Sequence, residues 1–178
     1  MRIISGQFKG KKLLPPKHDI RPTLDKVKQA LFTKLQFETP NAVVLDLFCG
    51  SGALGIEAVS RNAKKVMFFD SNFQSIALTK SNIESLKLEN NNTQIEILQK
   101  DYLTALNGLN EKFDLIILDP PYESGFYVKA LQIIKEKDML AENGVIVCER
   151  LKAKKIEQSF FALDCTKNYG TISLDYFV

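Results

Sequence analysis

Short apolar runs recur along the chain, and longer amphipathic segments separate them. Runs rich in Val, Ile, Leu and Phe are typical of buried strands, whereas apolar residues spaced three and four apart indicate helices. The pattern predicts strands near 42–48, 65–70, 94–99, 113–119 and 144–149. Between these strands it predicts helices near 53–62, 73–88, 102–108 and 125–136.

The alternation of strands and helices predicts right-handed βαβ units, and therefore an α/β fold whose parallel sheet carries helices on both faces. The tail from Phe160 to Val178 differs, because two strand-like runs flank the residues Asn168, Tyr169 and Gly170. Asn and Gly favour a tight turn, so we expect a hairpin in the tail. The chain shows no internal repeat or linker, and 178 residues fit a single domain.

The amino-terminal segment lies outside this alternation. Residues 2–14 predict a short β-hairpin, and a loop leads from it to Arg21. A helix should begin at Thr23, because threonine is a good N-cap. The apolar stripe of this helix comprises Leu24, Val27, Leu31 and Leu35.

Positive charge is concentrated at the amino terminus. Residues 1–28 contain eight Lys or Arg and two Asp, which gives +6; the whole chain carries +3, so residues 29–178 carry −3. Lysines surround Phe8, and cations beside an aromatic ring suit RNA, whose phosphates and bases they can hold. A basic hairpin that only aids solubility would look the same. The lysines concerned are Lys9, Lys11 and Lys12; a smaller cluster, which we expect to be merely solvated, is Lys152, Lys154 and Lys155.

The composition excludes several classes of site. Cys49, Cys148 and Cys165 are an odd number without metal-ligand spacing, which indicates a reducing compartment. The single histidine, His18, lies in a polar loop where we expect it to be solvated, so the sequence favours neither a zinc site, for which one histidine leaves few ligands, nor a histidine-based triad. The amino terminus lacks the apolar core of a signal peptide, and no apolar run is long enough to span a bilayer. We therefore expect a cytoplasmic monomer with no metal and no membrane partner, in which Cys49 is a small packing residue.

The sequence Asp119-Pro120-Pro121-Tyr122 ends a predicted strand at the carboxyl edge of the sheet. Carboxylate and prolyl carbonyl oxygens accept N–H bonds, and the fixed φ of proline holds its carbonyl still. The tyrosine ring offers a face on which a flat base can stack. These residues predict a site for a planar substrate with an amino group, although a Pro-Pro turn that caps a core strand has the same appearance.

A second motif, Gly50-Ser51-Gly52, follows the first strand. It predicts a tight loop that lets a ligand approach the backbone, ahead of a helix whose first N–H groups are free. The spacing to Gly55 also matches the dinucleotide fingerprint. Asp46 distinguishes the two interpretations, because an acid beside the loop repels a pyrophosphate but suits a ligand with an ammonium and a sulfonium, such as S-adenosylmethionine. Asp46 could instead only cap the loop.

Two further acids end predicted strands. Asp70 follows the second strand, where a carboxylate can accept the ribose hydroxyls of a nucleoside. Asp101 follows the third strand, where it could accept an adenine amino group. Aspartate is also among the best helix N-caps. We favour the ligand role for Asp70, and both interpretations remain open for Asp101.

Together these motifs resemble those of the class I S-adenosylmethionine-dependent amino-methyltransferases. The segment 46–52 looks like their cofactor loop, and the segment 119–122 looks like their (Asp/Asn)-Pro-Pro-(Tyr/Phe) catalytic motif. The segments 2–13 and 21–28 add a narrower resemblance to the RsmD-type family of bacterial enzymes. Those enzymes methylate the N2 amine of a guanine in small-subunit (16S) ribosomal RNA. The resemblance covers nearly the whole chain, from Arg2 through the 119–122 motif, and is weak after about residue 150.

The resemblance implies a Rossmann-like fold with a mostly parallel seven-stranded sheet over residues 24–178, preceded by a basic hairpin and loop at 1–23. It implies S-adenosylmethionine as cofactor, S-adenosylhomocysteine as product, and ribosomal RNA or the small ribosomal subunit as partner. Asp119 and the Pro120 carbonyl would accept the N–H bonds of the guanine amine, and Tyr122 would stack on the ring. The expected RNA contacts are Phe8, Lys9, Lys11 and Lys12. The expected cofactor residues are Arg21, Thr23, Asp46, Phe48, Gly50, Ser51, Gly52, Asp70, Ser71, Asp101 and Tyr102.

Three alternative functions use some of the same features. An amino-methyltransferase that acts on DNA adenine N6 or on a protein glutamine needs the same kind of pocket. A nicotinamide-dependent oxidoreductase fits the glycine loop, but leaves Asp46 and the segment 119–122 without a task. A non-catalytic RNA-binding module fits the basic terminus, but not intact cofactor and catalytic motifs.

Overall fold

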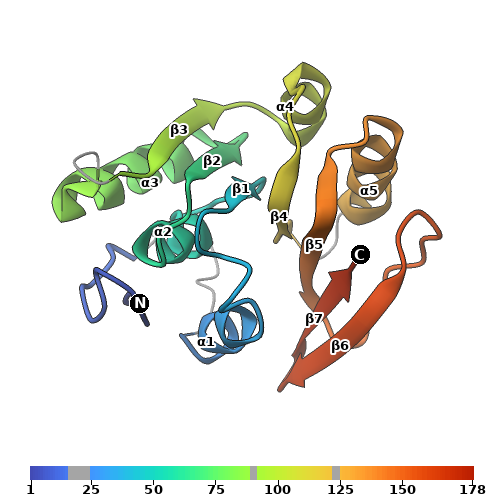
Figure 1. The fold of residues 1–178 in the computed structure, drawn as a ribbon, viewed down its shortest axis with the longest axis horizontal. Helices are drawn as coiled ribbons and strands as arrows, with labels where there is room; N and C mark the ends of the chain where they lie inside the picture. The colour runs from blue at the N-terminus through green and yellow to red at the C-terminus, as the bar shows by residue number, and fades with distance from the viewer. Residues whose placement is uncertain (16–24, 89–91, 122–124) are drawn as a thin grey trace.

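The computed structural model describes residues 1–15, 25–88, 92–121 and 125–178. Its strands form one seven-stranded sheet in the order β3-β2-β1-β4-β5-β7-β6 (Figure 1). Five strands pair in parallel: β1 (Val43–Asp46), β2 (Lys65–Asp70), β3 (Gln94–Gln99), β4 (Phe113–Leu118) and β5 (Leu140–Leu151). The predicted tail hairpin, β6 (Leu163–Tyr169) and β7 (Ile172–Phe177), joins β5 antiparallel. The predicted α/β class and the mostly parallel sheet are confirmed.

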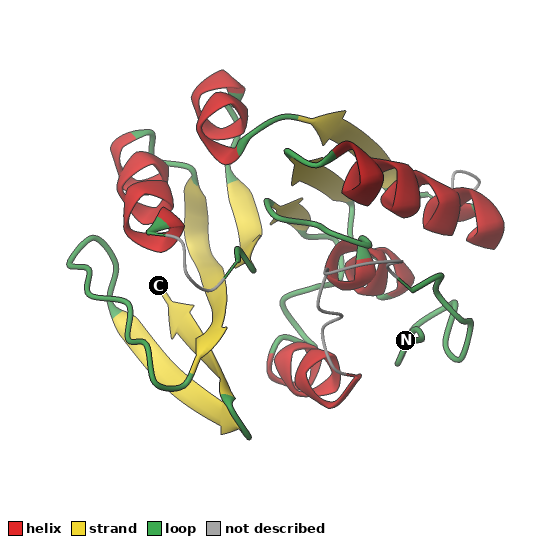
Figure 2. Cartoon of the chain, turned by 180° about the vertical axis from the view of Figure 1, so that it is seen from behind, coloured by secondary structure: helices red, strands yellow, loops and turns green. Residues whose placement is uncertain are grey.

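Helices cover both faces of the sheet, as Figures 1 and 2 show. Neighbouring strand residues alternate between two cores: Val44 packs in one and Leu45 in the other. The first core includes residues of α1 (Asp25–Lys34), α2 (Ala53–Ser60) and α3 (Phe73–Leu86). The second core includes residues of α4 (Tyr102–Gly108) and α5 (Phe126–Glu136). Strands buried on both faces explain why their sequences read as nearly continuous apolar runs.

The predicted hairpin over residues 2–14 is shorter than expected. The segment, which we call the amino-terminal arm (residues 1–15), folds back on itself antiparallel with one bridge pair, Arg2 and Lys12. Ile3 donates to the Lys11 carbonyl at 2.9 Å and Leu13 donates to the Met1 carbonyl at 3.1 Å, but the next N–H groups bond outside the arm. Ile4 and Ser5 donate to the Glu57 carboxylate of α2 at 2.8 and 2.9 Å.

Buried charges fasten the arm and α1 to α2. Lys28 is fully buried, and its Nζ lies 3.3 Å from Glu57 Oε2 while it donates to the Arg2 carbonyl. Arg61 donates from Nε to Glu57 Oε1 at 3.0 Å. Desolvation lowers the pKa of Lys28, and the attraction of Glu57 opposes this shift. Glu57 therefore joins three segments of the chain. The predicted N-cap Thr23 and stripe residue Leu24 lie outside the described residues.

The strand β5 is longer than predicted at both ends. Sequence favoured 144–149, whereas the strand spans Leu140–Leu151. Its register against β4 shifts between the pairs Phe113–Leu140 and Leu115–Val145, so extra residues bulge out there. Asn143, at φ +64°, belongs to this bulge. Asn and Gly are common at such bulges, because they tolerate the backbone angles that a bulge requires.

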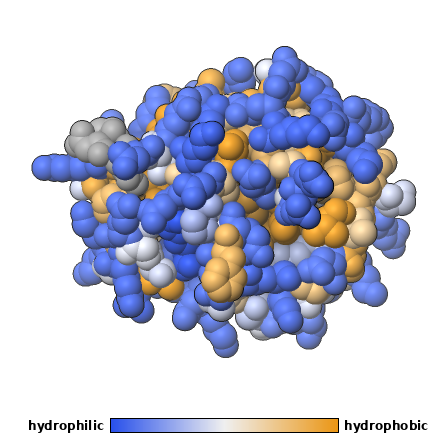
Figure 3. All heavy atoms as spheres, viewed as in Figure 1, coloured by the Kyte–Doolittle hydropathy of each residue, from blue (hydrophilic) through white to orange (hydrophobic). Residues whose placement is uncertain are grey.

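One face of the molecule is mainly polar. The face shown in Figure 3 is largely hydrophilic, with apolar side chains in small groups between the polar ones. Within the described ranges, no helix combines the length and the apolar character that crossing a membrane requires.

Candidate functional site

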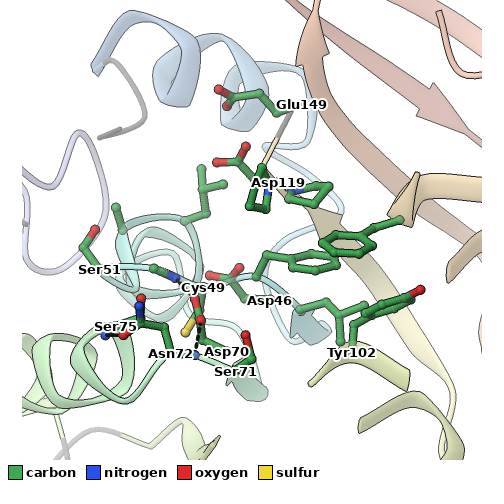
Figure 4. A pocket seen from close by; sticks show the side chains of 18 of the residues that line it. Asp46, Cys49, Ser51, Asp70, Ser71, Asn72, Ser75, Tyr102, Asp119 and Glu149 are labelled. Carbon is green, nitrogen blue, oxygen red and sulfur yellow. Dashed lines mark hydrogen bonds between the residues drawn. The ribbon is translucent and has the colours of Figure 1, made fainter. Parts of the chain in front are cut away.

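A cavity of about 590 Å³ opens at the carboxyl edge of the sheet. The loops that follow four adjacent strands, β1 to β4, meet there, as expected at the switch point of an open parallel sheet. Figure 4 shows Asp119 and Glu149 on one side, Asp70, Ser71, Asn72 and Ser75 on the opposite side, and Asp46 between them. The predicted site residues that line the cavity are Asp46, Phe48, Gly50, Ser51, Asp70, Ser71, Asp101, Tyr102, Asp119 and Pro120.

Asp46 is the last residue of β1 and is only 1% exposed. Its Oδ2 accepts the Gly55 N–H at 2.9 Å, and no ion pair joins it to a cation of the described chain. Burial raises the pKa of Asp46 to about 7; the Gly55 hydrogen bond opposes this rise and the charge of Asp70 adds to it. A buried carboxylate at a cavity without a cationic neighbour fits a ligand that carries its own positive charge.

Close packing against α3 and β2 requires glycine at two positions of the glycine loop and α2. Gly52 has φ +76°, and a Cβ there would meet Thr79 Cγ2 of α3 at 2.8 Å. A Cβ at Gly55 would meet the Phe68 ring of β2 at 2.2 Å. Both glycines are therefore needed for close packing of the loop and of α2. Gly52 does not line the cavity in this structure, so the predicted cofactor contact at Gly52 remains untested.

A buried polar stripe on α3 holds the loop in place. Thr79 donates to the Gly50 carbonyl at 3.1 Å, and Asn82 donates from Nδ2 to the Ser51 carbonyl at 2.9 Å. Asn82 also accepts the Leu14 N–H of the arm at 2.7 Å through Oδ1. Both α3 side chains are fully buried. Asn82 thus bonds both the arm and the glycine loop to α3.

Asp70 links two loops at the cavity. Its Oδ2 accepts the Gly50 N–H at 3.0 Å, and its Oδ1 accepts the Asn72 N–H at 2.8 Å. A carboxylate has about four lone-pair sites, so capacity remains for two hydroxyl donors of a ligand. This arrangement is compatible with the predicted ribose contact.

Asp101 is the N-cap of α4, as the capping interpretation had it. It accepts the Thr104 N–H at 3.0 Å and the Thr104 hydroxyl at 2.5 Å. These hydrogen bonds lower the pKa of Asp101. The exposed carboxylate also lines the cavity, so capping and ligand binding do not exclude each other here.

An aromatic cluster forms one wall. The rings of Phe48 and Phe126 are stacked with centroids 5.9 Å apart, and Tyr102 lies 5.7 and 5.0 Å from them. Sequence analysis selected Phe48 and Tyr102 but missed Phe126, the first residue of α5. This apolar wall suits a flat ring, which it can contact over a large area.

The side of the cavity that faces Asp70 carries a pair of acidic residues. Asp119 and Glu149 directly follow Leu118 and Cys148, which pair across β4 and β5. Glu149 is buried, and its carbonyl accepts the Tyr127 hydroxyl of α5. Sequence analysis missed Glu149, although the rule that selected Asp70, an acid at the end of a strand, applies to it equally. Pro120 is buried, and Tyr122 lies outside the described residues, as do Arg21 and Thr23.

Cys49 lines the cavity as a buried thiol, and burial holds its pKa well above the ordinary value. Its Sγ lies 3.6 Å from Thr79 Oγ1. A protonated, packed thiol is a poor nucleophile. The predicted packing role of Cys49 agrees with these contacts.

The basic tip of the arm lies away from the cavity. The Phe8 N–H donates to Ser60 Oγ at 3.0 Å, and Ser60 is the last residue of α2. That helix begins at the glycine loop and spans eight residues, so its ends are about 12 Å apart. Phe8 is half-buried against the core, with Lys11 Nζ 5.2 Å from its ring centroid. Lys9, Lys11 and Lys12 are exposed there.

Comparison with known proteins gives a family match over the full chain: the model described as Conserved hypothetical protein 95 matches residues 1–178. A Bacillus subtilis protein, YlbH, named as a proposed rRNA methyltransferase, is 36% identical, covering 96% of this chain and 94% of that protein. Ribosomal RNA small subunit methyltransferase D of Haemophilus influenzae is 35% identical, covering 88% and 81%.

Solved structures show the same fold. The structure of yhhF from Escherichia coli, titled as a proposed methyltransferase, has a TM-score of 0.86 at 26% identity and covers 99% of this chain and 96% of that chain. An RNA methyltransferase from Salinibacter ruber, in complex with S-adenosyl-L-homocysteine, has a TM-score of 0.66 at 14% identity, covering 88% and 92%.

Proposed function

Since the chain belongs to the family described as Conserved hypothetical protein 95, the RsmD-type family, we propose that it transfers a methyl group from S-adenosylmethionine to the exocyclic N2 amine of a guanine in small-subunit ribosomal RNA. Two relatives that are about as similar to this chain as the Bacillus subtilis protein are named ribosomal RNA small subunit methyltransferase D. These names support methyl transfer as the reaction and small-subunit ribosomal RNA as the class of substrate. The choice of guanine N2 comes from the resemblance of the motifs.

One observation carries the proposal: the glycine-loop acids and the Asp-Pro-Pro segment line a single cavity. Asp46 and Asp70 would hold the ammonium and the ribose of the cofactor, and the wall of Phe48 and Tyr102 would contact its adenine. The acceptor base would then enter on the side of Asp119 and Pro120. Cofactor and acceptor would meet where the two halves join, which is the positioning that methyl transfer requires.

The residues of the acceptor half would make the amine reactive. The lone pair of an exocyclic guanine nitrogen is delocalised into the ring, so the nitrogen is a poor nucleophile. Asp119 and the Pro120 carbonyl, both pure acceptors, would take its two N–H bonds and favour a pyramidal nitrogen with an available lone pair. The nitrogen then bonds to the methyl carbon as the carbon–sulfur bond breaks, and the sulfur keeps the electron pair. The nitrogen loses one proton, to Asp119 or to water.

The target base has to leave its stack to reach such a cavity. Tyr122 would then hold the base by stacking. Arg21 and Thr23 would close over the cofactor, as the family resemblance implies. We further propose that residues 1–178 act as one domain in the cytoplasm, with ribosomal RNA or the small ribosomal subunit as partner.

The experiment that tests the proposal is nucleoside analysis of ribosomal RNA treated with purified protein and methyl-labelled cofactor. Label should appear in N2-methylguanosine from small-subunit RNA. Label only in N6-methyladenine, or only in protein, would refute the guanine assignment and favour another acceptor for the same pocket.

A further inference from the structure

We infer that the lysine turn, residues 152–155, binds the phosphate backbone of the acceptor RNA at the rim of the cavity. This inference rests on the proposed function and adds the surface that receives the substrate. From the sequence alone, Lys152, Lys154 and Lys155 look like a solvated cluster. Their place in the fold changes that interpretation.

The turn follows the strand that carries Glu149 into the cavity. Lys152 comes three residues after Glu149 and directly after the end of β5, so it lies about 10 Å beyond Glu149 along the strand direction. It is therefore at the carboxyl edge of the sheet and on the same side of β4 as Glu149. The cofactor half, built on β1, β2 and β3, lies on the other side of β4. A nucleotide whose base entered beside Asp119 would bring its phosphates toward this turn.

A buried ionic network fixes the base of the turn. Arg150 is 6% exposed, and its Nε and Nη2 donate to the Asp175 carboxylate at 2.5 and 2.9 Å. Its Nη1 donates to the carbonyls of Leu151 and Lys152 at 3.2 and 3.3 Å. The Lys152 N–H donates to the Thr171 carbonyl of the β6–β7 turn at 2.8 Å. The buried guanidinium thus holds two successive carbonyls, and less backbone entropy would be lost when the turn binds a partner.

The charges of the turn are available to a ligand. Lys152, Lys154 and Lys155 are exposed, and none forms an ion pair with a residue that the structure describes. The guanidinium of Arg150 is neutralised by Asp175, so the exposed positive charge belongs to the lysines. The neighbouring acids are Glu149, which faces the cavity, and the exposed Glu157. Lysine without an acidic partner is a point charge suited to phosphate.

The arm alone would not bring RNA to the acceptor side. Its basic tip lies at the end of α2 that is farther from the glycine loop. The lysine turn, which follows β5 at the carboxyl edge, would supply phosphate contacts on the acceptor side.

The test compares two triple variants with equal loss of charge. One changes Lys152, Lys154 and Lys155 to Gln; the control changes Lys64, Lys80 and Lys112 to Gln. The control lysines are exposed; Lys64 and Lys112 directly precede β2 and β4, at the opposite edge of the sheet. Binding to a transcript of small-subunit ribosomal RNA is measured over a range of salt concentrations, with labelled methyl transfer to the same RNA and titration with S-adenosylhomocysteine.

We expect the lysine-turn variant to lower the slope of log K against log salt by about two, because each lost single-strand phosphate contact contributes about 0.7. Its KM for RNA should rise about tenfold, with kcat and S-adenosylhomocysteine affinity unchanged. Replacement of the three lysines by Arg should keep RNA binding. The two triple variants could instead show equal salt slopes while the unaltered protein methylates the RNA. That result would overturn the RNA-binding role of the lysine turn and leave the proposed function intact. No transfer to RNA by the unaltered protein, with label in DNA or protein instead, would overturn both.

Discussion

Asp46 illustrates how one residue depends on its place in the fold. An acid four residues before a glycine loop is visible in the sequence. Its burial at the end of β1, under the first turn of α2, is not, and that burial is what raises its pKa to about 7. The carboxyl group is therefore close to half-protonated at neutral pH until a cation binds beside it.

Cofactor affinity should depend on pH through Asp46. The folded pKa is raised, so the carboxyl gains a proton as pH falls through about 7 and then no longer attracts an ammonium. We expect S-adenosylhomocysteine to bind about tenfold more weakly at pH 6 than at pH 8, since the ionised fraction of Asp46 falls by about that factor. Calorimetric titration measures this. Asp46→Asn should bind weakly at both pH values, and an unaltered protein with the same affinity at pH 6 and 8 would contradict the role.

Asp119 should act on the acceptor and contribute little to cofactor binding. Asp119→Ala is expected to abolish methyl transfer to RNA while S-adenosylhomocysteine still binds, because the residue lies on the acceptor side of the cavity. The matched variant Asp70→Asn should do the reverse and weaken S-adenosylhomocysteine binding by about 1.5–3 kcal/mol, the loss of charge-assisted hydrogen bonds. Titration and single-turnover transfer separate the two. Near-normal turnover by Asp119→Ala would show that another group receives the amine.

The role of a residue could be predicted from the sequence where only one sequence rule applied to it. The role stayed ambiguous where two rules applied to the same residue. Asp101 satisfies both the capping rule and the strand-end rule, and it caps α4 and lines the cavity at once. Glu149 satisfies the strand-end rule and was still missed, because no motif surrounds it. Phe126 could not be identified without knowing that α5 begins beside Phe48.

At the scale of elements, α3 is the least predictable part of the site. Ser75, Thr79 and Asn82 are buried polar residues on one helix face, and two of them hold the glycine loop. In the sequence they look like solvent-facing positions. The packing of α3 against the loop gives Thr79 and Asn82 the backbone partners that buried polar groups require.

Asn82→Ala should lower both thermal stability and cofactor affinity. The change leaves the Leu14 N–H and the Ser51 carbonyl without their buried partner, at a cost of about 1–3 kcal/mol. The exposed neighbour Ser81, changed to Ala, is the control. Thermal unfolding with and without S-adenosylhomocysteine measures both effects. A variant with normal affinity and normal melting temperature would mean that the arm and the loop are held independently of Asn82.

The predicted element boundaries were wrong where a side chain accepted backbone N–H groups or where a bulge interrupted the ladder. The arm looked like a hairpin because turn residues separate two short apolar runs. Its antiparallel pairing is short, because Glu57 and Ser60 receive N–H groups that a longer ladder would have used. A contact between residues more than fifty positions apart leaves no signal in local sequence.

At the scale of the whole molecule, strand and helix alternation was enough to predict an α/β fold with helices on both faces. The seven-stranded sheet and its antiparallel hairpin followed from the family resemblance, since periodicity does not give strand order. The charge asymmetry was also visible from composition. Where the charges lie was not: the lysine turn stands beyond Glu149 at the carboxyl edge because β5 continues to Leu151.

The position of β4 between β1 and β5 has a consequence for folding kinetics. The pairing of β1 with β4, which brings the two halves of the cavity together, joins distant parts of the sequence: Val43 and Asp114 of these strands are 71 positions apart and hydrogen-bonded. Closing such a loop is entropically costly, and contacts of this kind slow folding. During refolding, we expect tight S-adenosylhomocysteine binding to appear with the slowest phase and not with helix formation, as stopped-flow circular dichroism and ligand fluorescence can resolve. Binding in the fast phase would mean that β1, β2 and β3 form a competent cofactor site before β4 arrives.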